Sequence, residues 1–132
     1  MKKRTFLAAA VAVAFTPVAA FAADFVSYKP GLIKSSLKAG KTVLVDYSAT
    51  WCSTCKRQAR VIKALREENP AYDKSMTFIK VDWDTYKRKN VTTSRSIPRR
   101  STLLVLRGGK ELGRIVAGTS TSKIKALMDK GL

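Results

Sequence analysis

The sequence predicts one small α/β domain, in which helices cover the faces of a mixed β-sheet. Patterns typical of helices and of strands alternate along most of the chain, and no segment is repeated. The 132 residues are enough for a single domain, and a hydrophobic content of 45% is enough for a packed core. The predicted order of elements is α-β-α-β-α-β-β-α.

The amino-terminal segment has the pattern of a secretory signal peptide. Residues 1–4 carry three basic side chains, residues 6–15 are all apolar, and an Ala-x-Ala cleavage site ends at Ala22. Cleavage there would remove residues 1–22 and leave residues 23–132 as the mature domain. We therefore expect the protein to be exported.

An uncleaved membrane anchor over residues 6–23 is the alternative for this segment. It is only marginally long enough to span a bilayer, and Pro17 interrupts it. The short, alanine-rich signal instead favours a bacterial protein that is located in the periplasm.

Helices are expected where apolar residues recur at helical spacing. Gly40 ends the first of them, and the residue before Pro70 ends the second and longest. The third is short and polar, and Ser122 is expected to cap the last. The predicted helices are residues 32–39, 52–68, 84–90 and 122–130.

Strands are expected where β-branched and aromatic residues form short runs. The first run is almost continuously apolar, which is typical of a strand that is buried on both faces. The last two runs are joined by a hairpin turn at residues 107–110, whereas residues 24–29 are expected to form a polar lead-in. The predicted strands are residues 42–48, 76–81, 103–106 and 111–116.

The chain is strongly basic, with 26 Lys and Arg residues against 9 Asp and Glu residues. Without the three basic residues of the amino-terminal segment, 23 basic residues still outnumber the 9 acidic ones by 14. Such a charge favours acidic partner surfaces. Nucleic acid is not an expected partner, because no binding motif is present and the protein is expected to be exported.

The sequence contains no His, which excludes a Ser-His-Asp triad, a Cys-His nucleophile and a His-ligated metal or haem. Its two cysteines are too few for a disulfide-rich scaffold or a four-thiolate zinc site. They are sufficient for one redox pair.

The two cysteines, Cys52 and Cys55, lie one helical turn apart at the start of the long helix. Unpaired N–H groups at a helix N-terminus stabilise a thiolate at Cys52, and we expect Cys55 to be more buried. A purely structural disulfide and a Cu(I) site are the alternatives. The first would close too short a loop to stabilise much, and the second lacks a third ligand because Met76 and Met128 are expected in the core.

Residues 43–56, which read Val-Leu-Val-Asp-Tyr-Ser-Ala-Thr-Trp-Cys-Ser-Thr-Cys-Lys, resemble the strand and active-site turn of thioredoxins. The resemblance covers nearly all of residues 32–130 and implies a thioredoxin fold. It also implies that Cys52 is the nucleophile, that Cys55 resolves the mixed disulfide by forming the Cys52–Cys55 bond, and that Asp46 assists proton transfer. Independently, the apolar surroundings of the Asp46 carboxyl are expected to raise its pKa. Neither a cofactor nor a metal is implied.

Two further positions follow from the resemblance. Lys80 matches a lysine that faces Asp46, although it could equally point to solvent. Thioredoxins also place a cis-proline beside the cysteines, which we assign to Pro98. Ser101 is the alternative, because residues 99–102 separate Pro98 from the next strand. The residues expected to contact substrates are Trp51, Ser53, Thr54, Pro98, Arg99 and Arg100.

These features together predict an exported, monomeric thiol-disulfide oxidoreductase that reduces or exchanges protein disulfides. In an oxidising compartment, such a reductase needs an electron donor, for which a membrane thiol carrier is expected. The remaining alternatives are a Cu(I)-binding dithiol module and a basic adaptor whose disulfide is only structural.

Overall fold

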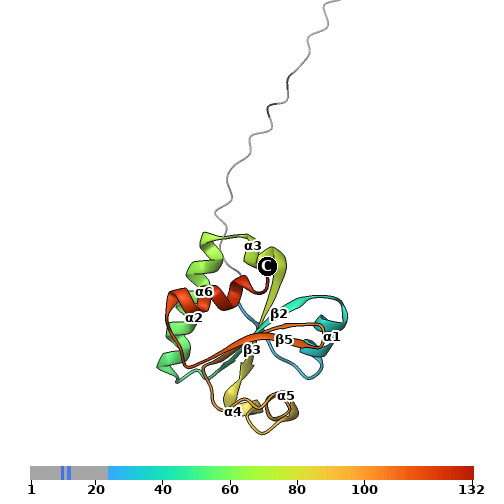
Figure 1. The fold of residues 1–132 in the computed structure, drawn as a ribbon, viewed down its shortest axis with the longest axis vertical. Helices are drawn as coiled ribbons and strands as arrows, with labels where there is room; N and C mark the ends of the chain where they lie inside the picture. The colour runs from blue at the N-terminus through green and yellow to red at the C-terminus, as the bar shows by residue number, and fades with distance from the viewer. Residues whose placement is uncertain (1–9, 11, 13–23) are drawn as a thin grey trace, which may run out of the picture.

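The computed structural model describes residues 10, 12 and 24–132, and residues 24–132 form helices around a central sheet (Figure 1). The predicted signal peptide at residues 1–22 lies outside the described residues, apart from Ala10 and Ala12. Among the described residues, no helix has both the length and the apolar character needed to cross a bilayer.

The sheet has the strand order β1-β3-β2-β4-β5 in the described part of the chain. β1, β3 and β2 run parallel to one another. β4 pairs antiparallel with β2, and β5 pairs antiparallel with β4. β2 is central, and all of its residues are buried, as its near-continuous apolar run predicts. The strands are β1 (Val26–Ser27), β2 (Thr42–Ser48), β3 (Met76–Asp82), β4 (Thr102–Arg107) and β5 (Lys110–Val116).

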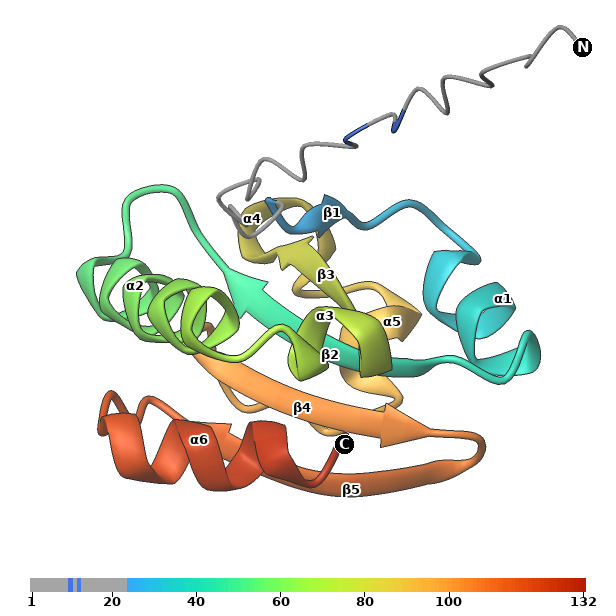
Figure 2. The same cartoon turned by 90° about the horizontal axis from the view of Figure 1, so that it is seen from above.

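Side chains alternate along the strands, so the sheet has two different apolar faces. Leu44 and its neighbours pack against α2, α3 and α6, whereas Val45 and its neighbours pack against α1 and the segment around α4 and α5. Figure 2 shows α2 and α6 side by side, away from α1. The helices are α1 (Leu32–Lys38), α2 (Ser53–Glu68), α3 (Ala71–Ser75), α4 (Trp83–Tyr86), α5 (Asn90–Thr93) and α6 (Thr121–Asp129).

The predicted α/β class and its four main strands are confirmed, as are the first, second and last helices. The single helix predicted at residues 84–90 is wrong, because the chain forms two short helices there. Asp82 caps α4 by accepting a hydrogen bond from the backbone N–H of Thr85. The cap predicted at Ser122 is also wrong, since Ser120 accepts from the N–H of Lys123.

Two short elements have no clear sequence signal. β1 comprises two exposed residues and is held by its parallel pairing with β3, where Val26 lies opposite Ile79. α3 has five residues, and its buried Tyr72 joins the apolar cluster below α2. Both elements are stabilised by tertiary contacts rather than by local sequence pattern. Met76 and Met128 are buried in the core, as predicted.

Candidate active site

Cys52 and Cys55 form a disulfide at the beginning of α2, with their Cα atoms 5.3 Å apart. β2 ends at Ser48, and a short loop leads directly to Cys52, which occupies the N-cap position of the helix. The backbone N–H of Cys55 donates to the Cys52 Sγ over 3.2 Å. A thiolate at Cys52 would therefore accept a hydrogen bond at the positive end of the helix dipole.

The two cysteines are almost equally buried. Cys52 is 3% exposed and Cys55 is 1% exposed, so the predicted difference in exposure is small. Ala49 packs directly against the pair, together with the partly buried Trp83. The chemical difference between the two sulfurs therefore comes from their neighbours rather than from their exposure.

Asp46 is fully buried in the middle of β2, and neither of its carboxylate oxygens has a hydrogen-bond partner. Burial raises the pKa of Asp46 to about 7, although the charge of Lys80 opposes part of that effect. Side chains two residues apart in a strand point to the same face of the sheet. Asp46 therefore lies on the same face as Leu44, which α2 covers. A carboxyl with a pKa near neutrality is suited to accepting and returning a proton.

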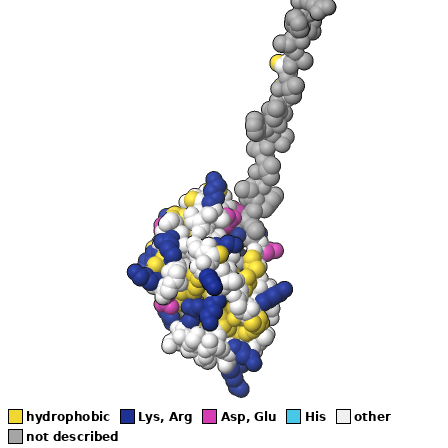
Figure 3. All heavy atoms as spheres, turned by 90° about the vertical axis from the view of Figure 1, so that its right-hand side faces the viewer, with side chains coloured by type: hydrophobic (Ala, Val, Ile, Leu, Met, Phe, Trp, Pro, Cys, Tyr) yellow, Lys and Arg dark blue, Asp and Glu magenta, His cyan; other side chains and the backbone are white. Residues whose placement is uncertain are grey.

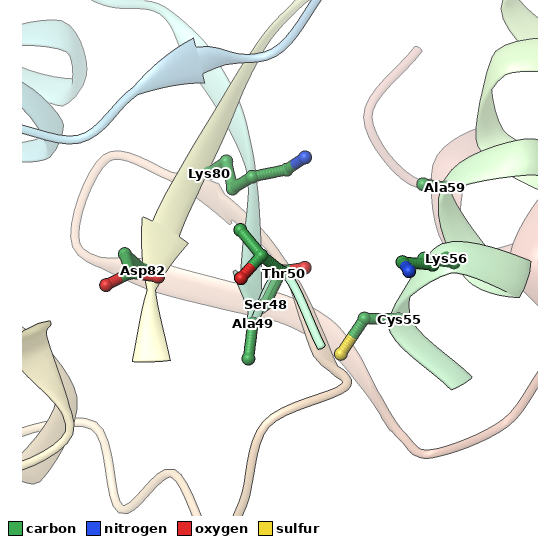
Figure 4. Close-up of a pocket in the computed structure, with 8 residues that line it drawn as sticks. All are labelled: Ser48, Ala49, Thr50, Cys55, Lys56, Ala59, Lys80 and Asp82. Atoms are coloured by element: carbon green, nitrogen blue, oxygen red, sulfur yellow. The ribbon is translucent and has the colours of Figure 1, made fainter. Parts of the chain in front are cut away.

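Lys80 lies directly opposite Asp46 in the parallel register of β2 and β3. Its Nζ is 5.3 Å from the centroid of the Phe25 ring. Its side chain also lines a pocket of about 240 Å³, with Cys55 on α2 at one side and Asp82 on β3 at the other (Figure 4). The pocket is further lined by Ser48, Ala49, Thr50, Lys56 and Ala59.

The structure does not support Pro98 as a cis-proline beside the cysteines. The described residues contain no cis peptide bond, and the Pro98 side chain is exposed. Ser101 occupies that place, with its Oγ 3.2 Å from the Cys52 Sγ and 3.0 Å from the Cys55 Sγ. The backbone N–H of Ser101 donates to the carbonyl of Tyr47 on β2, which holds this residue against the site.

Trp51 provides an exposed aromatic surface next to Cys52, with 57% of its area accessible. Its Nε1–H donates to Asp84 over 2.8 Å, and the guanidinium carbon of Arg100 lies 4.4 Å from the centroid of its ring. Arg100 therefore lies beside Trp51, the residue that precedes Cys52. Arg99 is half-buried and donates to the carbonyl of Arg100, so it supports this loop.

Ser53 and Thr54 separate the two cysteines in the first turn of α2. Ser53 is exposed and Thr54 is partly buried, so the outer surface of this turn is polar. Within residues 24–132, no cluster of three or more His, Cys, Asp or Glu side chains is arranged to hold a metal ion.

Gln58 is a site residue that sequence analysis missed. It is fully buried in α2, one turn after Cys55, and its Nε2 donates to the carbonyls of Ser101 and Gly118. A polar residue at position i+3 on the cysteine-bearing face of the helix is the signal that could have identified it. Gln58 links α2 to the loop that precedes β4.

A disulfide pair at a helix N-terminus, next to a central strand that carries a buried acid, defines a dithiol redox protein. Residues 28–130 match the family model described as Thioredoxin. The chain therefore belongs to the thioredoxin family and is a thiol-disulfide oxidoreductase with a thioredoxin fold. Proteins of this family act on protein thiols and disulfides.

Three individual relatives are each about one-third identical to this chain. The chain is 34% identical to Thioredoxin-1 of Saccharomyces cerevisiae over 91 residues, which are 69% of this chain and 82% of the yeast protein. It is 36% identical to a thioredoxin of Chlamydia trachomatis over 89 residues, covering 67% and 80% of the two chains. The crystal structure of Trxlp from Edwardsiella tarda superposes with a TM-score of 0.67 at 32% identity, covering 77% of this chain and 97% of Trxlp.

Proposed function

We propose that this protein is an exported thioredoxin that reduces disulfides in other exported proteins. The observation that carries the proposal is the Cys52–Cys55 pair at the N-terminus of α2, with the partnerless Asp46 carboxyl on the strand beneath it. The helix terminus favours a nucleophilic thiolate, and the buried acid supplies a proton acceptor.

In the first step, the Cys52 thiolate attacks one sulfur of a substrate disulfide. A Cys52–substrate disulfide forms, the substrate S–S bond breaks, and the other substrate sulfur leaves as a thiolate that takes a proton from solvent. The N–H of Cys55 already points at the Cys52 Sγ, so the attacking charge is stabilised before the reaction begins.

In the second step, Cys55 resolves the mixed disulfide. Asp46 accepts the Cys55 thiol proton, and the resulting thiolate attacks the Cys52 Sγ. The Cys52–Cys55 bond forms, and the second substrate sulfur leaves as a thiolate and is protonated. Two electrons pass from the cysteine pair to the substrate, so a dithiol donor must reduce the pair again. We assign that role to a membrane thiol carrier, because the protein is expected outside the cytoplasm.

Substrates are recognised at Trp51 and Arg100. The exposed indole offers an apolar platform beside Cys52, and the guanidinium stacked on it supplies positive charge. The chain as a whole is basic, and the face of the molecule in Figure 3, which is turned away from the N-terminus of α2, carries more Lys and Arg side chains than acidic ones. This arrangement favours substrate segments that carry acidic residues near their disulfide.

The direction of electron flow is tested by the equilibrium of the Cys52–Cys55 pair with glutathione. A reductase role requires a potential near that of thioredoxin, about −270 mV. A value near −120 mV, typical of a strong oxidant, would overturn it. Reduction of insulin by the wild type, with Cys52→Ser as the inactive control, checks the activity itself.

Export is tested by expression of the full chain in a bacterium, followed by fractionation and mass measurement. The proposal requires a periplasmic product that begins at Ala23. A product that retains residues 1–22 in the cytoplasmic fraction would overturn it.

A further inference from the structure

Ser101 is a buried serine whose hydroxyl lies between the two active-site sulfurs. The Oγ is 3.2 Å from the Cys52 Sγ and 3.0 Å from the Cys55 Sγ, both within the range of hydrogen bonds to sulfur. In the disulfide, neither sulfur carries a proton, so the hydroxyl must be the donor. A proline, which thioredoxins place beside the cysteines, has no side-chain donor to offer there.

The backbone of Ser101 is fixed by hydrogen bonds to β2, to α2 and to the residue that follows β5. Its N–H donates to the Tyr47 carbonyl over 2.7 Å, and its carbonyl accepts from the Ala117 N–H and from the Gln58 Nε2. Its φ angle is 64°, a left-handed conformation that is uncommon for residues other than glycine. Such conformations concentrate at functional sites, where surrounding contacts enforce them. The fold therefore holds the hydroxyl against the sulfurs at a conformational cost.

We propose that the Ser101 hydroxyl bridges the reduced pair, donating a hydrogen bond to the Cys52 thiolate and accepting one from the Cys55 thiol. This inference rests on the proposed function, in which Cys52 is the attacking thiolate. A hydrogen bond to a charged sulfur is stronger than one to a neutral disulfide sulfur. Ser101 therefore stabilises the reduced protein more than the oxidised one, and it makes the pair more oxidising than it would be without the hydroxyl.

Other charged groups also act on the thiolate, and they come from each element around the pair. Their positions do not depend on the Ser101 side chain, so a change confined to Ser101 leaves them in place. These groups are Asp46 on β2, Lys56 on α2, Lys80 and Asp82 on β3, Asp84 on α4 and Arg100 beside Trp51.

Two substitutions remove the hydroxyl in different ways. Ser101→Ala keeps the Cβ atom, and Ser101→Gly suits the positive φ angle, so at least the second is compatible with the fold. In both variants we expect the ultraviolet titration of the Cys52 thiolate to move to higher pH by about one pH unit. The equilibrium with glutathione should shift about tenfold toward the disulfide, which corresponds to about 30 mV.

Ser96→Gly is the matched control, because Ser96 is exposed and also has a positive φ angle, 54°. It should change neither measurement. The proposal would be overturned if both Ser101 variants matched the wild type in the thiolate titration and in the glutathione equilibrium. Insulin reduction by the wild type is measured in parallel. Its absence would contradict the proposed function, whereas the titration decides the role of Ser101 separately.

Discussion

The two sulfurs of the active-site disulfide have different surroundings. On the Cys52 side lie the exposed Trp51 and the Arg100 guanidinium, which are suited to meeting a substrate. On the Cys55 side lie the pocket lined by Lys80 and, on the sheet face below α2, the buried Asp46. The first region is built from an exposed indole and a partly buried guanidinium, and the second from a fully buried carboxyl group. Substrate encounter and proton transfer should therefore respond to different substitutions.

The largest effect is expected on stability, because Asp46 must stay uncharged to be buried at low cost. Its folded-state pKa of about 7 is above its ordinary value of 3.8, so the folded state holds a proton that the unfolded state has lost. The free energy of unfolding should be constant below about pH 4, fall by about 4 kcal/mol as the pH rises to about 7, and then level off.

The test is urea unfolding of the oxidised protein across this pH range. Asp46→Asn should lack the fall and should be the more stable protein at pH 8. Glu67→Gln, at an exposed position on α2, is the matched control and should follow the wild type. Parallel pH profiles for the wild type and Asp46→Asn would show that Asp46 is ionised at its ordinary pKa.

The next effect concerns resolution of the mixed disulfide. Asp46→Asn should slow the attack of Cys55 on the Cys52–substrate bond on the order of 10²-fold near neutral pH, because the proton acceptor is lost. The first attack by Cys52 should change little. Stopped-flow measurement of both steps with a small disulfide substrate separates them. The difference should shrink at high pH, where Cys55 loses its proton to solvent.

A smaller effect is expected on the substrate side. Arg100→Ser should reduce the rate with a disulfide peptide carrying acidic residues several-fold at about 0.02 M salt. At about 0.5 M salt the rates should converge, because the Debye length falls to about 4 Å. Arg88→Ser removes the same charge from an exposed position on the segment between α4 and α5 and is the control. Identical salt dependence for the two variants would place Arg100 outside the encounter surface.

The two regions also differ in how far the sequence predicts them. The strand, the turn and the helix that carry Asp46, Cys52 and Cys55 are contiguous, so apolar runs and cysteine spacing locate them directly. The position of Ser101 depends instead on hydrogen bonds from β2, α2 and the end of β5, which are distant in sequence. Pro98 has the stronger local signal, but its side chain is exposed and its peptide bond is trans. A residue such as Ser101, which is positioned by contacts with distant parts of the chain, leaves no periodic pattern in the sequence by which it could be predicted.

The central claim is that Cys52 attacks the substrate disulfide and that Cys55 resolves the mixed disulfide. Trapping of the mixed disulfide tests this claim most directly. Cys55→Ser, treated with a disulfide substrate after reduction, should accumulate a one-to-one covalent adduct on Cys52 that dithiothreitol releases. Cys52→Ser should form almost none under the same conditions, since only Cys52 occupies the N-cap position and accepts a backbone N–H of the first turn. Equal adduct formation by the two variants, measured by intact-protein mass, would contradict the assignment of Cys52 as the attacking sulfur.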